Sequence, residues 1–265
     1  MKPILSTQIS TKAKFLVIFF AFLAGATACT KSGISGGGDV KILTLQPAAA
    51  AGDNVSVYDP VPYNEDPSET TYVVTAPTQN FNGDTIMSVS NTGFESFYAA
   101  NTLLRFNGVS VLPATATIIS ANLYLYGVDS ITTNIYGVVN SPGQFGNTVG
   151  TDVSGDYFAL QQLSASWGDD SVTWVNMPTA VTTNNVAIPP SVSRWDNNDT
   201  LDITGLVQSW QANPSQNYGI RLAAVSGLNA QARQPFPGNF VQMQFYSSYA
   251  ANPLVRPKLI VTYKQ

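Results

Sequence analysis

The stretch "ISANLYLYGV" (119–128) decides the fold class, because apolar and amphipathic residues alternate along it. In an extended chain Leu123 and Leu125 point to one face, and Tyr124 and Tyr126 point to the other. Runs of the same kind, rich in β-branched and aromatic residues, occur at 71–76, 84–90, 102–109, 134–139, 171–175, 217–225, 240–248 and 257–263. Together they predict an all-β protein whose antiparallel strands form a sandwich.

One segment, "LDITGLVQSWQANPSQ" (201–216), departs from the β pattern. Val207 and Trp210 recur there at helical spacing, and Asp202 or Thr204 can cap the start of a helix. We therefore expect one short helix that closes an end of the sandwich, with Trp210 in the core rather than on a ligand-binding surface.

The first 28 residues predict a lipoprotein signal peptide. A leader with three lysines precedes the apolar run "FLVIFFAFLAGA" (15–26), which is short for a stable membrane span. Small residues then precede Cys29, as in a bacterial lipobox, although Ala26 replaces the usual leucine. Because Cys29 is the single cysteine of the chain and cannot form an internal disulfide, lipidation explains it best. We expect a lipid-anchored, extracytoplasmic protein of the cell envelope, attached to the outer membrane.

The mature chain divides into two parts. Residues 29–71 begin with the Gly- and Ser-rich "TKSGISGGGDV" (30–40), and we interpret them as a flexible tether and linker with at most one strand, "VKILTL" (40–45). Residues 72–265 form the predicted sandwich domain.

The net charge of the mature chain argues against one class of partner. Without residues 1–28, nine basic residues face 16 acidic ones, a formal charge of −7. This balance argues against nucleic acid as a partner, which requires a concentrated basic surface. The chain contains no histidine, the commonest general base and zinc ligand.

Four blocks in order resemble the DNRLRE-domain (disaggregatase-related) family. They are "NTLLRFNGVSVLPATATIISANLYLY" (101–126), "WGDDSVTWVNMP" (167–178), "LDITGLVQSWQANPSQNYGIRL" (201–222) and "FYSSYAANPLVRPKLIVTY" (245–263). The resemblance implies a jelly-roll-type sandwich on secreted or surface proteins, often attached to polysaccharide-degrading enzymes and in some cases classed with carbohydrate-binding modules. Tyr249 stands where the family commonly has an acidic residue, so an ion pair made there is not expected.

Catalysis is not expected. Asp169 and Asp170 are neighbours, so on an extended chain their carboxylates point to opposite faces and cannot flank one sugar. Trp174, in a β-branched run, is predicted to be a core residue. Asp196, Asn198 and Asp199 carry the oxygen ligands that calcium prefers, but a turn and a helix cap explain the same residues. We therefore predict no cofactor and no catalytic metal, and a structural calcium ion is the weaker alternative.

Polysaccharide binding needs exposed rings to stack on sugars and polar groups to pair with them. Arg105 and Arg221 each stand between apolar residues and should face away from the core, as should Tyr124 and Tyr126. Trp195 lies in a polar stretch and is the tryptophan expected at the surface. These five residues are our candidate glycan-binding residues. The alternative function is a structural or adhesive surface protein that binds another protein, with the arginines pairing with acids or covering apolar surface.

Overall fold

The computed structural model describes residues 38–47, 54–61, 78–92, 97–128, 132–133, 139–140, 158–181, 183, 185–189, 198–224 and 240–265. The strand expected at 71–76 and most of the one expected at 134–139 lie outside these residues.

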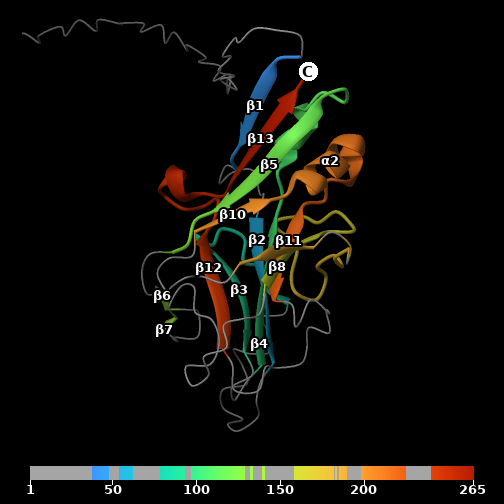
Figure 1. The fold of residues 1–265 in the computed structure, drawn as a ribbon. Coiled ribbons are helices and arrows are strands. Elements are labelled where there is room, and N and C mark those ends of the chain that lie inside the picture. Colours follow the sequence, from blue (N-terminus) through green and yellow to red (C-terminus); the bar gives the residue numbers. More distant parts are fainter. Residues whose placement is uncertain are drawn as a thin grey trace, which may run out of the picture.

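The described residues form two large antiparallel sheets, which confirms the predicted sandwich (Figure 1). The smaller sheet has the order β1-β13-β5-β10, and the larger has the order β12-β3-β4-β11-β8-β9, with β2 also paired to β4. The strands are β1 (Val40–Leu45), β2 (Asn54–Val61), β3 (Ile86–Thr92), β4 (Phe97–Leu104), β5 (Thr117–Leu125), β8 (Phe158–Gln162), β9 (Val186–Ile188), β10 (Asp199–Asp202), β11 (Ile220–Ala224), β12 (Phe240–Tyr246) and β13 (Lys258–Lys264), and a separate pair is made by β6 (Thr132–Thr133) and β7 (Val139–Asn140).

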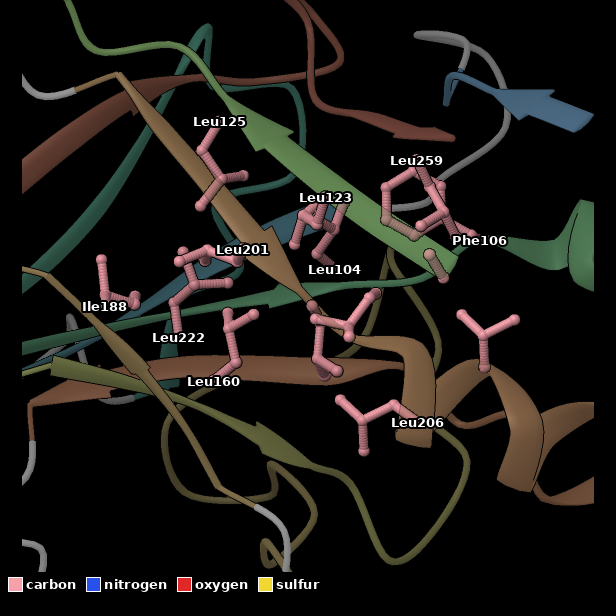
Figure 2. Packing of buried hydrophobic residues seen from close by; sticks show 14 of the residues in the cluster. Leu104, Phe106, Leu123, Leu125, Leu160, Ile188, Leu201, Leu206, Leu222 and Leu259 are labelled. Atoms are coloured by element: carbon pink, nitrogen blue, oxygen red, sulfur yellow. The ribbon is translucent and has the colours of Figure 1, made fainter. Parts of the chain in front are cut away.

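The core lies between the inner faces of the two large sheets. In the smaller sheet Leu123 of β5 is in register with Leu259 of β13 and with Leu201 of β10, and all three are buried. They pack in one cluster with Leu160 and Leu222, which are in register in the larger sheet (Figure 2). The alternation of 121–125 therefore produces a continuous apolar layer, as predicted, whereas Ile119 at the start of the stretch is exposed.

The predicted helix is shorter than its segment. Its first residues form β10, and α2 (Thr204–Ala212) follows and packs beside β5 (Figure 1). The Asp202 carboxylate accepts hydrogen bonds from the amide (2.9 Å) and the hydroxyl (2.6 Å) of Thr204, the first residue of the helix, and so satisfies its first amide, whereas the N-cap residue is Ile203. Trp210 is fully buried in the core. The connections that the structure describes include the 3-10 helices η3 (Asn107–Val111), η4 (Pro214–Gln216) and η5 (Pro253–Val255).

The fold begins earlier than predicted. β1 and β2 both lie within residues 29–71, which we expected to be a tether and linker. β1 pairs with β13 along its whole length, and its Leu43 and Leu45 pack against the core. The one strand that we allowed in this linker, at 40–45, is β1, whereas β2 was not expected, and both pair with strands that lie beyond residue 72.

The segment 164–181 covers the outer face of the larger sheet instead of joining it. The run 171–175 forms turns, so the predicted strand there is wrong. Trp167 is buried with Leu103 and Leu163 in a second apolar cluster, whereas Trp174 is half-buried and packs at its margin. Trp174 is therefore not a core residue in the predicted sense. Side-chain hydrogen bonds to backbone atoms replace strand pairing, as when the Asn80 amide donates to the carbonyls of Asp169 and Val172, each at 2.7 Å.

Candidate functional site

The first candidate surface is the outer face of the smaller sheet, where the side chains of Tyr124, Tyr126 and Lys258 meet. We call these three residues the tyrosine face. Tyr124 and Tyr126 alternate with the buried Leu123 and Leu125, so both rings point to solvent and are half-exposed. The predicted outward orientation of both rings is correct.

Lys258 connects the two rings. It is the register partner of Tyr124 on β13, and its Nζ lies 5.3 Å from the ring centroid of Tyr124 and 5.6 Å from that of Tyr126. These are cation–π distances, so the ammonium group holds the two rings in a fixed relation. Neither tyrosine hydroxyl forms a hydrogen bond with another residue in the described part of the chain. The surface therefore offers two ring faces, two hydroxyls and one cation.

Polar residues border the tyrosine face. Thr200 of β10 is the register partner of Tyr124, and Asp202 is that of Asn122. The hydroxyl of Thr204, and then its amide, donate hydrogen bonds that lower the pKa of Asp202, so this carboxylate stays ionised well below neutral pH. The border supplies hydroxyl, amide and carboxylate groups of the kind that pair with sugar hydroxyls.

Arg105 and Arg221 lie on the other side of the molecule, on the outer face of the larger sheet. The guanidinium carbon of Arg105 is 4.7 Å from the ring centroid of Trp167, and its Nη1 donates to the Trp167 carbonyl at 3.2 Å. The Trp167 indole in turn donates to the carbonyl of Tyr218 at 2.8 Å. Arg105 is half-buried, and its Nε has no hydrogen-bond partner among the described residues.

Arg221 is half-buried in the same face. It is in register with Leu103 on one side and with Gln161 on the other, and its guanidinium donates hydrogen bonds to Oε1 of Gln161. Burial lowers the pKa of Arg221 from its usual value without neutralising it. Within the described chain neither Arg105 nor Arg221 pairs with a carboxylate, whereas Arg105 lies over the Trp167 ring, in keeping with the alternative in which the arginines cover apolar surface.

The candidate glycan-binding residues do not form one site. The sandwich separates the tyrosine face from Arg105 and Arg221. Trp195 lies outside the described residues. Sequence reasoning missed Lys258, although the alternation of "PKLIVTY" (257–263) places it opposite the buried Leu259 and Val261. It also missed that the ring in contact with the Arg105 guanidinium is that of Trp167 rather than Trp174.

The proposed calcium ligands diverge. Asn198 is exposed and accepts a hydrogen bond from the Gly127 amide at 2.9 Å, whereas Asp199 is buried on the inner side of β10. Asp196 lies outside the described residues. No group of three or more acidic, Cys or His side chains able to hold a metal occurs in the part of the chain that is described. Burial raises the pKa of Asp199 to about 7.

The acids of the two-tryptophan segment have structural contacts. Asp169 and Asp170 lie in a turn, not on the extended chain from which we argued that they diverge. The Asp170 carboxylate accepts a hydrogen bond from the Asn82 amide at 2.6 Å, and the Tyr249 hydroxyl donates to the other side of the same amide group. Where the resembled family would place an acid, Tyr249 thus makes a neutral contact that joins two loops.

No model of a known protein family matches this chain, and no curated protein is significantly similar to it. Among the described residues, no helix is both long enough and apolar enough to cross a membrane.

Proposed function

We propose that this protein is a lipid-anchored protein of the cell envelope that binds polysaccharide without transforming it, and that the tyrosine face is the binding surface. The observation that carries the proposal is the pair of half-exposed rings, Tyr124 and Tyr126, whose hydroxyls are free of described partners and which Lys258 holds side by side.

The chemistry of this surface suits a sugar chain. The apolar faces of pyranose rings stack on aromatic rings, and hydroxyls or carboxylates of the sugar pair with hydroxyl, amide and ammonium groups. Two residues along a strand span about 7 Å, so the two rings present an extended platform rather than a pocket. A platform suits internal units of a polymer, because it leaves both ends of the bound segment open.

Two features of the sequence support the same function. The four ordered blocks resemble a family with carbohydrate-binding members, and the lipobox-like segment before Cys29 would hold the module at the outer membrane. Weak single sites suffice in that arrangement, since many anchored copies can engage one polymer. The second surface, with Arg105 and Arg221, offers two guanidinium groups that suit carboxylates of acidic sugars.

Affinity electrophoresis and a glycan array with the mature chain test the proposal. Tyr124→Ala and Tyr126→Ala should each weaken binding to the polysaccharide selected on the array by about two- to tenfold, as expected for the loss of one stacking ring. Tyr124→Phe keeps the aromatic ring and should therefore retain the contribution of stacking to the affinity. Val175→Ala is the matched control. Val175 is exposed and lies in a segment remote from β5 and β13, so this variant should bind like the wild type.

The outcomes separate the alternatives. Binding that survives both tyrosine variants but is lost in Arg105→Gln or Arg221→Gln would move the site to the other face. No binding to neutral or acidic polysaccharides would refute the function and favour the adhesive alternative. Melting temperatures of all variants, measured in parallel, show whether a variant binds more weakly because it is unfolded.

A further inference from the structure

Exposed aliphatic side chains gather at one end of the smaller sheet. Of the six large hydrophobic residues that are exposed among those described, three lie there: Val40 (52%), Ile42 (58%) and Ile119 (47%). Val40 and Ile42 alternate with residues that pack on the core, so they are on the outer face of β1. Ile119 is the residue that the register shift between β5 and β13 skips, which leaves it unpaired and turned outward.

One lysine accompanies these aliphatic residues on the same face. Lys264, which is exposed, is the register partner of Val40. We call Val40, Ile42, Ile119 and Lys264 the aliphatic patch. After Cys29 the chain has four lysines, at positions 31, 41, 258 and 264. Of the three that the structure describes, Lys264 lies in the patch, Lys41 alternates with Val40 and Ile42 and so points to the opposite face of β1, and Lys258 belongs to the tyrosine face. The single acid next to the patch in sequence is Asp39. Apolar side chains edged by lysine are the composition of surfaces that rest on anionic lipid headgroups.

The position of the patch in the chain points to the same partner. Residues 30–39 separate Cys29 from Val40. Ten residues reach at most about 35 Å when fully extended, so a lipid attached to Cys29 keeps β1 within that distance of the bilayer. β1 is also the outer strand of its sheet, next to β13 (Figure 1). The strand nearest in sequence to the anchor is therefore the one that carries two of the exposed aliphatic residues.

We propose that the aliphatic patch is a membrane-contact surface that rests on the anionic phospholipid headgroups of the anchoring leaflet. This orientation rests on the lipid anchor at Cys29 proposed above, whereas the contact itself can be measured without it. Tyr124 is five residues farther along β5 than Ile119, or about 16 Å. The patch and the tyrosine face thus lie at different places along the same outer face, and the bilayer contact is proposed at the patch end.

Vesicle co-sedimentation of the mature chain carrying Cys29→Ser tests the contact apart from the anchor. The protein should bind vesicles of phosphatidylglycerol and phosphatidylethanolamine and not those of phosphatidylcholine, and added salt should release it. Lys264→Gln should weaken partition about fivefold, the usual contribution of one lysine at an anionic surface. Ile42→Ser and Ile119→Ser should each weaken it severalfold. Leu254→Ser, at an exposed aliphatic residue of η5, is the control and should change nothing.

Equal binding of the wild type and the patch variants, or no binding to anionic vesicles, would overturn the proposal. A concentration-dependent dimer dissolved by Ile42→Ser would assign the patch to a second copy of the chain and would overturn it too. Tyr124→Ala should lose polysaccharide and keep vesicle binding, so the membrane contact and the proposed function can fail independently.

Discussion

Asp199 should make the stability of this protein fall as the pH rises toward neutrality. Its side chain points inward from β10, beside the register partner Leu125, and Oδ2 has no hydrogen-bond partner in the described part of the chain. Burial raises the pKa of Asp199 from its ordinary 3.8 to about 7. Between these two values the unfolded chain has lost the proton and the folded chain still holds it. The free energy of unfolding therefore decreases across this window and becomes level above it.

The size of the effect follows from the pKa difference. Each unit is worth about 1.4 kcal/mol, so a rise from 3.8 to about 7 corresponds to at most roughly 4 kcal/mol. Asp199→Asn keeps the shape of the side chain and removes its ionisation. The variant should match the wild type near pH 4 and exceed it in stability by a few kcal/mol near pH 8.

Urea denaturation of the wild type and Asp199→Asn across that pH range measures the difference. Asp202→Asn is the matched control, because hydrogen bonds from Thr204 lower the pKa of Asp202. Its carboxylate stabilises the fold above the ordinary pKa and ceases to do so as the pH falls through the lowered one. This substitution should thus destabilise at neutral pH and not in acid. If Asp199→Asn retains the wild-type loss of stability between about pH 4 and 7, the assignment to Asp199 is refuted.

Four further substitutions probe the packing. Gly219→Ala should lower stability by about 2 kcal/mol in urea denaturation, because Gly219 has φ +86° and a Cβ there would lie 2.5 Å from the Leu104 carbonyl oxygen. Trp210→Ala should cost about 3–5 kcal/mol, as for other fully buried tryptophans, and a smaller loss would show that α2 is peripheral. Trp167→Ala should reduce the melting temperature more than Trp174→Ala, since Trp167 is only 8% exposed and supports Arg105; the reverse order would contradict the placement of the two rings.

Local alternation is what made the sandwich predictable. It fixed the inward faces of Leu123 and Leu125 and the outward faces of Tyr124 and Tyr126, and it turned Arg105 away from the core. These are properties of a few consecutive residues in an extended chain, so no distant partner is needed to read them.

Features that depend on distant partners could not be predicted. The run 171–175 forms turns, in which the Asn176 side chain accepts from the Thr173 amide and donates to the Ser171 carbonyl. Asn80, about ninety residues away, also donates to the carbonyls of Asp169 and Val172. β8 and β10 are short and carry one β-branched residue between them, so their pairing rather than their composition makes them strands. The contact of Lys258 with Tyr124 and Tyr126 could not be predicted for the same reason, because β13 is far from β5 in the sequence.

The place of β13 has a consequence for the order in which the molecule can assemble. β13 lies between β1 and β5 in the smaller sheet. It therefore pairs with the edge strand β1 on one side and with the central strand β5 on the other. Until these final residues are present, β1 has nothing to pair with and half of the core stays open. Contacts of such large sequence separation slow folding. The smaller sheet is therefore completed only when β13 is in place, whichever of the other strands have already paired.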